Sequence, residues 1–77
     1  MNILVVEDER NLADAIVRIL TDASYNADAA YDGRSGLRAA LSGSYDAVVL
    51  DVMLPGMDGN AVAHEMRRQG VSTPVLM

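Results

Sequence analysis

Two short apolar runs, each followed at once by carboxylates, constrain the fold of this chain more than any other feature of its sequence. Ile3–Val6 is β-branched at three of its four positions and leads directly into Glu7–Glu9. Asp46–Leu50 contains four apolar residues in succession and leads directly into Asp51. Runs of this length are typical of strands buried on both faces of a parallel sheet. We therefore predict two central strands, each with acidic side chains at its carboxyl end.

The segments between and after these runs change to a helical period. Leucine, isoleucine and alanine recur at helical spacing from about Arg10 onward, which predicts a first helix. Asp32–Gly33 offers an N-cap and a turn before a second helix that stops near Gly43. A third helix is predicted to open at Asp58–Gly59 and to stop at Gly70, because glycine is common just after helix ends.

Two further strands complete the pattern. Asn26–Ala30 is predicted as a short edge strand, and Thr73–Met77 as the start of another buried strand that is cut off in mid-element. Strands that alternate with helices at this spacing predict an α/β fold with a doubly wound parallel sheet and right-handed crossovers. In such sheets ligands bind outside the carboxyl ends of the strands, where the acidic residues of this chain fall.

The composition excludes several classes of function. The chain has 77 residues, enough for one small domain, and its 51% hydrophobic and 22% charged residues are typical of a globular protein. A net charge of −5, with six arginines that form no patch, argues against a nucleic-acid-binding surface. The absence of cysteine excludes disulfides and thiolate metal sites, and no apolar stretch is long enough to span a membrane. We expect a cytoplasmic domain with no membrane partner.

Glu7, Asp8 and Asp51 form the candidate site. If the strands that precede them are neighbours, the three carboxylates converge, and their mutual repulsion calls for a proton or a cation. Oxygen ligands with retained water suit Mg²⁺. One carboxylate beside such a cation could attack a phosphoryl group and form an aspartyl-phosphate. An isolated aspartate at a strand end is more often a cap or a solubilising residue, but Glu7 and Asp8 reverse that balance for Asp51.

Three stretches of the chain match a known family in order and in register. They are Glu7–Glu9 after its apolar strand, Ala30–Gly33 ahead of the second helix, and Asp46–Gly59. On these stretches the chain resembles the receiver domain of bacterial two-component response regulators. The resemblance implies a flavodoxin-like (CheY-like) fold with strand order 2-1-3-4-5, truncated after the fourth strand. Residues 1–77 would then be the N-terminal part of the domain, without its fifth strand and last two helices.

The resemblance also implies a role for each residue of the candidate site. Asp51 corresponds to the phospho-acceptor, which takes a phosphoryl group from a sensor histidine kinase. Asp8 corresponds to the residue that binds Mg²⁺ directly, and Glu7 to its partner, which often acts through water. Met53 corresponds to the position whose backbone carbonyl completes the protein's share of the metal site.

Other positions either shape the loop or depart from the family. Pro55 and Gly59 correspond to residues that shape the loop beside the acceptor. Ser24 stands where a glycine commonly precedes the second strand, which puts that turn in doubt. The family has a serine or threonine just past the position of Met77 and later a lysine that pairs with the phosphoryl group. This chain contains no lysine, so the resemblance covers the acceptor and the metal ligands only.

The loop sequence points to a parent protein and leaves two alternatives open. Leu54–Gly59 is similar to the version common in OmpR/PhoB-like regulators, whose winged-helix output domain binds DNA. Such a domain is a signalling phospho-acceptor and not an enzyme, and it reaches DNA only through an output domain absent here. A first alternative is a receiver-like module without phosphotransfer that self-associates, for instance by strand exchange through an exposed Thr73–Met77. The second, an aspartate-nucleophile phosphatase, is disfavoured because Met53 stands where such enzymes carry a second aspartate.

Overall fold

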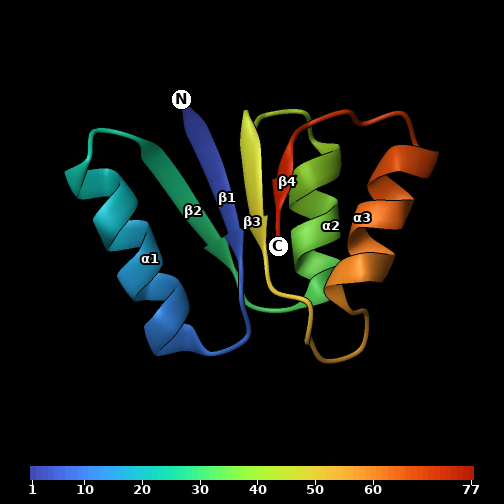
Figure 1. The fold of residues 1–77 in the computed structure, drawn as a ribbon, viewed down its shortest axis with the longest axis horizontal. Helices are drawn as coiled ribbons and strands as arrows, with labels where there is room; N and C mark the ends of the chain where they lie inside the picture. Colours follow the sequence, from blue (N-terminus) through green and yellow to red (C-terminus); the bar gives the residue numbers. More distant parts are fainter.

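Four parallel strands and three helices alternate along the chain in the computed structural model, which describes residues 1–77. In chain order the elements are β1 (Asn2–Val6), α1 (Arg10–Asp22), β2 (Asn26–Ala30), α2 (Gly33–Leu41), β3 (Ala47–Leu50), α3 (Gly59–Arg68) and β4 (Val75–Leu76). The strands stand side by side in the order β2-β1-β3-β4, and every neighbouring pair is parallel (Figure 1). This confirms the predicted doubly wound α/β sheet.

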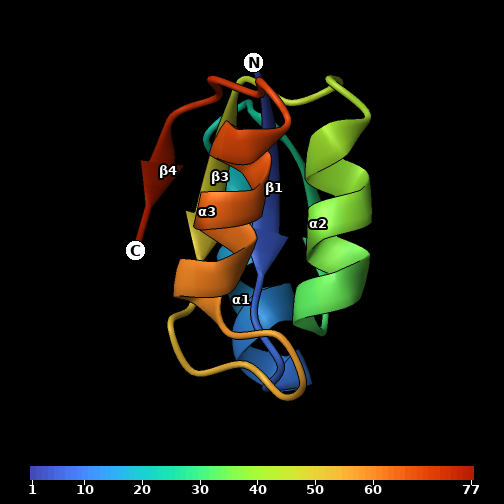
Figure 2. The ribbon, with the colours of Figure 1, turned by 90° about the vertical axis from the view of Figure 1, so that its right-hand side faces the viewer.

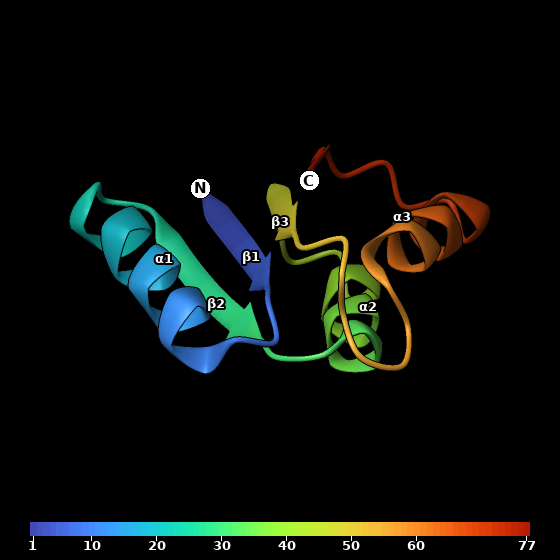
Figure 3. The same cartoon turned by 60° about the horizontal axis from the view of Figure 1, so that its bottom comes forward.

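The helices cover the two faces of the sheet unequally. Figure 2 shows α2 and α3 in front of β1 and β3, whereas α1 lies on the opposite face, and Figure 3 shows the same separation along the strands. A right-handed crossover places a helix on one face when the chain moves one way along the sheet and on the other face when it moves back. The chain moves from β1 to β2 and then reverses toward β3 and β4, so α1 stands alone on its face.

The main core lies between the sheet and the two helices α2 and α3. Its buried apolar residues come from the strands, both helices and the loop after β3: Leu4, Val6, Ala30, Ala40, Val48, Leu50, Leu54, Val62 and Met66. Alternate residues of β1 and β3 contribute to it, as expected for side chains that point to opposite faces of a strand. None of the helices has the length and apolar content needed to cross a membrane.

The three helices begin with the same device. In each, an acidic side chain at the N-cap accepts hydrogen bonds from free backbone N–H groups of the first turn, through Glu9 in α1, Asp32 in α2 and Asp58 in α3. The Oδ1 atom of Asp58, for example, accepts from the backbone nitrogen of Ala61 at 2.8 Å. These interactions confirm the predicted cap at Asp32 and the predicted helix start at Asp58, and they identify Glu9 as the cap of α1.

The helices also end alike, with a residue in the left-handed conformation. The φ angles are +73° at Ser24, +76° at Gly43 and +82° at Gly70. Behind α1 the backbone nitrogens of Ser24 and Tyr25 donate to the carbonyls of Thr21 and Leu20, each at 3.0 Å, which is a Schellman motif. Ser24 therefore performs in α1 what glycine performs in α2 and α3. The turn that the sequence left in doubt keeps the geometry of a glycine turn without a glycine.

The last strand differs from the sequence prediction. The segment Thr73–Met77 was expected to start a buried strand, but β4 contains only Val75–Leu76, which pair with Val48 and Val49 of β3. The side chains of Leu76 and Met77 are 70% and 56% exposed. Apolar character predicts strand structure, but burial also needs covering elements, and β4 lies at the edge of the sheet with β3 as its one neighbouring strand. The prediction of an exposed apolar edge strand is confirmed, and that of burial is wrong.

Candidate functional site

The sheet register places the acidic residues of two strands next to each other. Val6 and Leu50 are paired at the ends of β1 and β3, so Glu7 and Asp51 are the next residues on neighbouring strands. Backbone hydrogen bonds continue past the strand ends, since the nitrogen of Glu7 donates to the carbonyl of Ala30 and that of Asp51 to the carbonyl of Val6, both at 3.0 Å. The two side chains therefore start from backbone that the central strands hold in place.

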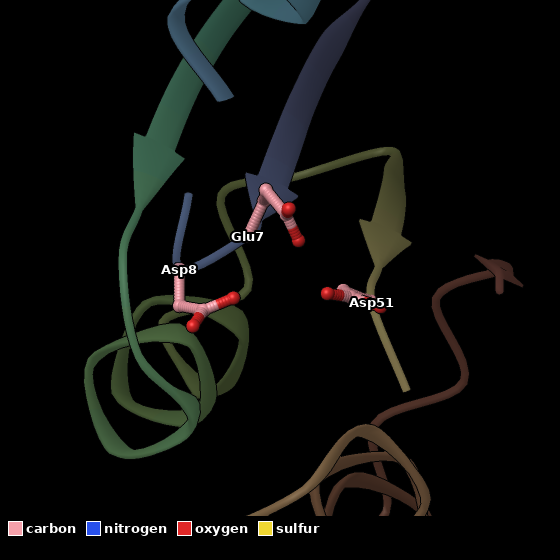
Figure 4. Close-up of side chains that lie close together, drawn as sticks. All are labelled: Glu7, Asp8 and Asp51. Carbon is pink, nitrogen blue, oxygen red and sulfur yellow. The ribbon is translucent and has the colours of Figure 1, made fainter. Parts of the chain in front are cut away.

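Three carboxylates converge at this edge. One oxygen from each of Glu7, Asp8 and Asp51 lies within 4.8 Å of the others. Figure 4 shows the three side chains lying close together, Glu7 and Asp8 from the end of β1 and Asp51 from the end of β3. Glu7 is buried, with 8% of its surface exposed, Asp51 is half-buried and Asp8 is exposed. The predicted convergence is present, with one side open to solvent.

The carboxylates lack cationic partners within the chain. A hydrogen bond that the protonated Glu7 carboxyl donates to Asp51, burial, and the charges of Asp51 and Asp8 together raise the pKa of Glu7 to about 7. The one ion pair of the molecule joins Glu65 and Arg68 on α3, away from the site. Negative charge that has no arginine beside it is met by a proton on Glu7 or by a cation from solution.

The donor set fits a hard divalent cation. Every candidate ligand atom is a carboxylate oxygen, and the exposed side at Asp8 leaves room for water and a further ligand. Mg²⁺ prefers oxygen ligands and usually keeps several waters while one or two carboxylates bind it. Glu7, Asp8 and Asp51 could hold such a cation without rearrangement of the strands that carry them.

The loop after β3 closes around Asp51. Its carboxylate Oδ1 accepts from the backbone nitrogen of Met53 at 3.3 Å, while the side chain of Met53 is 82% exposed. The nitrogen of Gly59 donates to the carbonyl of Val52 at 2.8 Å, and a Cβ added at Gly59 would lie 2.2 Å from the carbonyl oxygen of Asp51. Only glycine can approach the backbone of Asp51 so closely. Pro55 is exposed in the turn, where its carbonyl accepts from Met57 at 2.9 Å.

Two hollows flank the carboxylates. On the α1 face a hollow of about 460 Å³ reaches Glu7 and Asp51 and is otherwise lined by apolar residues, among them Val5, Leu12, Ile16, Val49, Leu76 and Met77. On the loop side a hollow of about 430 Å³ reaches Asp8 and Asp58. The carboxylates thus stand between a mainly apolar hollow on the α1 face and a hollow of mixed character on the loop side.

Sequence reasoning missed one residue beside this site. Gly33 was interpreted only as the turn partner of the Asp32 cap, but a Cβ at Gly33 would lie 1.8 Å from the carbonyl oxygen of Met57. The φ angle of Gly33 is not positive, so the backbone itself does not demand glycine. A glycine at the first helical position, directly after an N-cap that is already satisfied, was the available signal of a close approach.

Comparison with known proteins gives a single family. The family model of the response regulator receiver domain matches residues 3–77. The transcriptional regulatory protein TcrA of Mycobacterium tuberculosis is 52% identical over 77 residues, which are 100% of this chain and 30% of TcrA. The chain therefore spans about a third of the length of this relative.

Solved structures agree with the family match. The response regulator TrrA of Thermotoga maritima, crystallised in complex with Mg²⁺ and BeF, superposes with a TM-score of 0.89 at 36% identity. TrrA in complex with the histidine kinase ThkA superposes with a TM-score of 0.87, also at 36% identity. In both cases the match covers 96% of this chain and 64% of the other.

Proposed function

The chain belongs to the response regulator receiver domain family, and on this premise we propose that Asp51 accepts a phosphoryl group in a reaction that depends on Mg²⁺. The observation that carries the proposal is the convergence of Glu7, Asp8 and Asp51 within 4.8 Å at the carboxyl ends of β1 and β3. Family membership alone would not assign a role to any one carboxylate. The proposal extends to Met53, whose backbone carbonyl would be a further ligand, and to Pro55 and Gly59, which would shape the loop.

Each residue of the site has a distinct task in the proposed reaction. A carboxylate oxygen of Asp51 attacks phosphorus, an O–P bond forms, and the bond from phosphorus to the donor breaks with its electron pair remaining on the donor. Asp8 and Glu7 would hold the cation, and Glu7 would give up its proton when the cation binds. Mg²⁺, when bound, offsets the negative charge on the transferring oxygens. Gly59 keeps the backbone of Asp51 in place during the attack.

The relatives support a proposal for the phosphoryl donor and for the output of the parent protein. TrrA was crystallised with a histidine kinase, so we propose a phosphohistidine of a sensor kinase as the donor for Asp51. TcrA is a transcriptional regulatory protein, which supports a parent that controls transcription through a DNA-binding output domain. The coding sequence beyond Met77 checks this parent: a serine or threonine directly after β4, a later lysine and then a winged-helix domain are expected.

Acetyl phosphate supplies a direct test of the acceptor. With Mg²⁺, wild-type protein is expected to gain the mass of one phosphoryl group, and Asp51→Asn is expected to gain none. Asp58→Asn is the matched control, because Asp58 is an exposed aspartate of the same loop and asparagine still caps α3. An adduct that persists in Asp51→Asn, or a wild type that gains no mass, would contradict the proposal.

Self-association is a second candidate function, favoured by the exposed apolar residues of the α1 face and of β4. Ile19 is 67% exposed and Leu76 is 70% exposed, and β4 offers free backbone groups at the edge of the sheet. If the chain acts as a self-associating module, sedimentation is expected to show a dimer that Leu76→Lys disrupts. A monomer at every concentration would exclude this candidate.

A further inference from the structure

We propose that Gly33, in the first turn of α2, sets the position of the loop between β3 and α3 and is thereby a positioning residue for cation binding. The inference rests on the proposed function, because the loop carries Met53 and begins at Asp51. Gly33 itself touches neither a carboxylate of the site nor the proposed metal ligand. Its effect would pass through the backbone of the loop.

The contact between α2 and the loop has no room for a side chain. A Cβ at Gly33 would lie 1.8 Å from the carbonyl oxygen of Met57, 2.8 Å from its carbonyl carbon and 3.0 Å from its Cβ. The first two distances are to backbone atoms, which cannot rotate away as the end of a flexible side chain would. A methyl group at this position therefore has to move either the loop or the first turn of α2.

The first turn of α2 resists movement. The carboxylate of Asp32 accepts from the backbone nitrogen of Ser35 at 2.8 Å and from its hydroxyl at 3.1 Å. One turn further on, a Cβ at Gly36 would lie 2.6 Å from a methyl group of Val6, so the helix already packs against β1 as closely as its backbone allows. The loop is the partner that has to yield.

A displaced loop would carry its effect back to the site. Leu54 is buried in the core, and Met57 packs against the same core. The segment between them therefore cannot move independently of these core contacts. At its far end Asp58 caps α3, and the nitrogen of Gly59 bonds to the carbonyl of Val52, the residue after the acceptor. A shift at Met57 therefore reaches the backbone that supports Asp51.

The size of the shift decides its consequence. Relieving a contact of 1.8 Å to an ordinary distance of 3.4 Å needs a movement of roughly 1.6 Å. Constellations that bind or react are held to within about 0.5 Å of the productive geometry, and Mg²⁺ demands nearly ideal octahedral geometry. Replacing residues that support metal ligands lowers metal affinity by about tenfold or more. We expect a loss of that order in Gly33→Ala.

The test compares Gly33→Ala with Gly43→Ala. Each adds one methyl group at an end of α2, but Gly43 lies just past the C-terminal end of the helix, with φ of +76° and open space around it. Gly43→Ala should thus lower stability through backbone strain without touching the loop. For each protein we would measure urea unfolding, the Kd for Mg²⁺, and the amide NMR spectrum without metal. An osmolyte such as trimethylamine N-oxide keeps weakened variants folded.

In Gly33→Ala, amide shifts concentrated at residues 51–58 and a Kd for Mg²⁺ about tenfold higher are expected. Gly43→Ala should bind Mg²⁺ within about twofold of wild type even where it loses as much stability. Equal affinity and equal loop spectra in the two variants would overturn the inference. So would a Gly33→Ala chain that stays unfolded in the osmolyte while Gly43→Ala folds, because Gly33 would then serve the fold itself. If wild type binds no Mg²⁺, the proposed function fails, and the metal-free spectra still judge the role of Gly33.

Discussion

At Glu7 the candidate site needs a charged carboxylate, whereas the fold buries the side chain. The sequence predicts a carboxylate near Asp51, because both follow apolar strands that become neighbours. It does not predict that Glu7 is buried with 8% of its surface exposed while Asp8, the next residue, is exposed. That difference depends on where α1 and the neighbouring strand end lie, which is a property of the packed structure. The hydrogen bond to Asp51, burial and nearby negative charge then raise the pKa of Glu7 to about 7.

The raised pKa makes the stability of the metal-free protein depend on pH. In the folded state the pKa of Glu7 is about 7, against 4.5 for the free side chain, so the folded state binds the proton more tightly. The stability contribution is fully present below pH 4.5 and is lost as pH rises through 7. The difference in the free energy of unfolding between wild type and Glu7→Gln, measured in urea, should show this loss as pH rises. Saturating Mg²⁺ should abolish the loss. A pH-independent difference would contradict the prediction.

Leu50 and Leu76 show that an apolar residue in a strand need not be buried. Leu50, at the end of β3, is 1% exposed in the main core, whereas Leu76 in β4 is 70% exposed. Leu50→Ala should therefore lower the free energy of unfolding by about 2–5 kcal/mol, and Leu76→Ala by no more than about 0.5 kcal/mol. Thermal or urea unfolding of the two variants provides the comparison. Equal losses would mean that β4 is buried in solution, against the structure described here.

At the scale of elements, helix boundaries were the most predictable feature and strand burial the least. Asp32 and Asp58 were predicted as caps because a short acidic side chain can bond only the N–H groups of its own first turn. Such interactions are local in sequence. The extent of β4 is not local, since a strand exists only where a neighbour offers a matching register, and β3 pairs with two residues there.

Ser24 provides a prediction at the end of α1. A residue other than glycine in the left-handed conformation costs about 1–2 kcal/mol, and Ser24 holds φ of +73° where α2 and α3 use glycine. Ser24→Gly should raise the free energy of unfolding by about 0.5–1 kcal/mol after the added flexibility of the unfolded chain is subtracted. Ser72→Gly, in an exposed loop without positive φ, should lower it or leave it unchanged. Chemical denaturation distinguishes the two, and a destabilised Ser24→Gly would contradict the argument.

At the scale of the whole molecule, a thin core combines with uncompensated negative charge. Only 16 of the 77 residues are buried, and the net charge is −5. A core of this size provides little margin over the conformational entropy of the chain. Because three carboxylates meet at one edge, a single bound cation removes repulsion that the packing otherwise has to overcome.

Mg²⁺ should therefore stabilise the whole domain measurably. At a free concentration of 100 times Kd, ligand binding adds about 2.7 kcal/mol to the free energy of unfolding. Sodium chloride at equal ionic strength serves as the control, because it screens the net charge without binding the site. The midpoint temperature of thermal unfolding of wild type should rise more with Mg²⁺ than with sodium chloride. In Asp8→Asn the two salts should have the same effect. A rise of equal size in Asp8→Asn would indicate general screening in place of a site.

The sequence by itself determined the order and type of the elements, the parallel sheet and the residues of the candidate site. These features follow from period, capping and apolar runs, which act over a few residues, and from the rule that places carboxyl ends of parallel strands at one edge. The tertiary structure alone decided which carboxylate is buried, how much of β4 is covered, and that Gly33 lies against the carbonyl of Met57. Such contacts join segments distant in the chain, so their distances are set by packing and not by any local pattern.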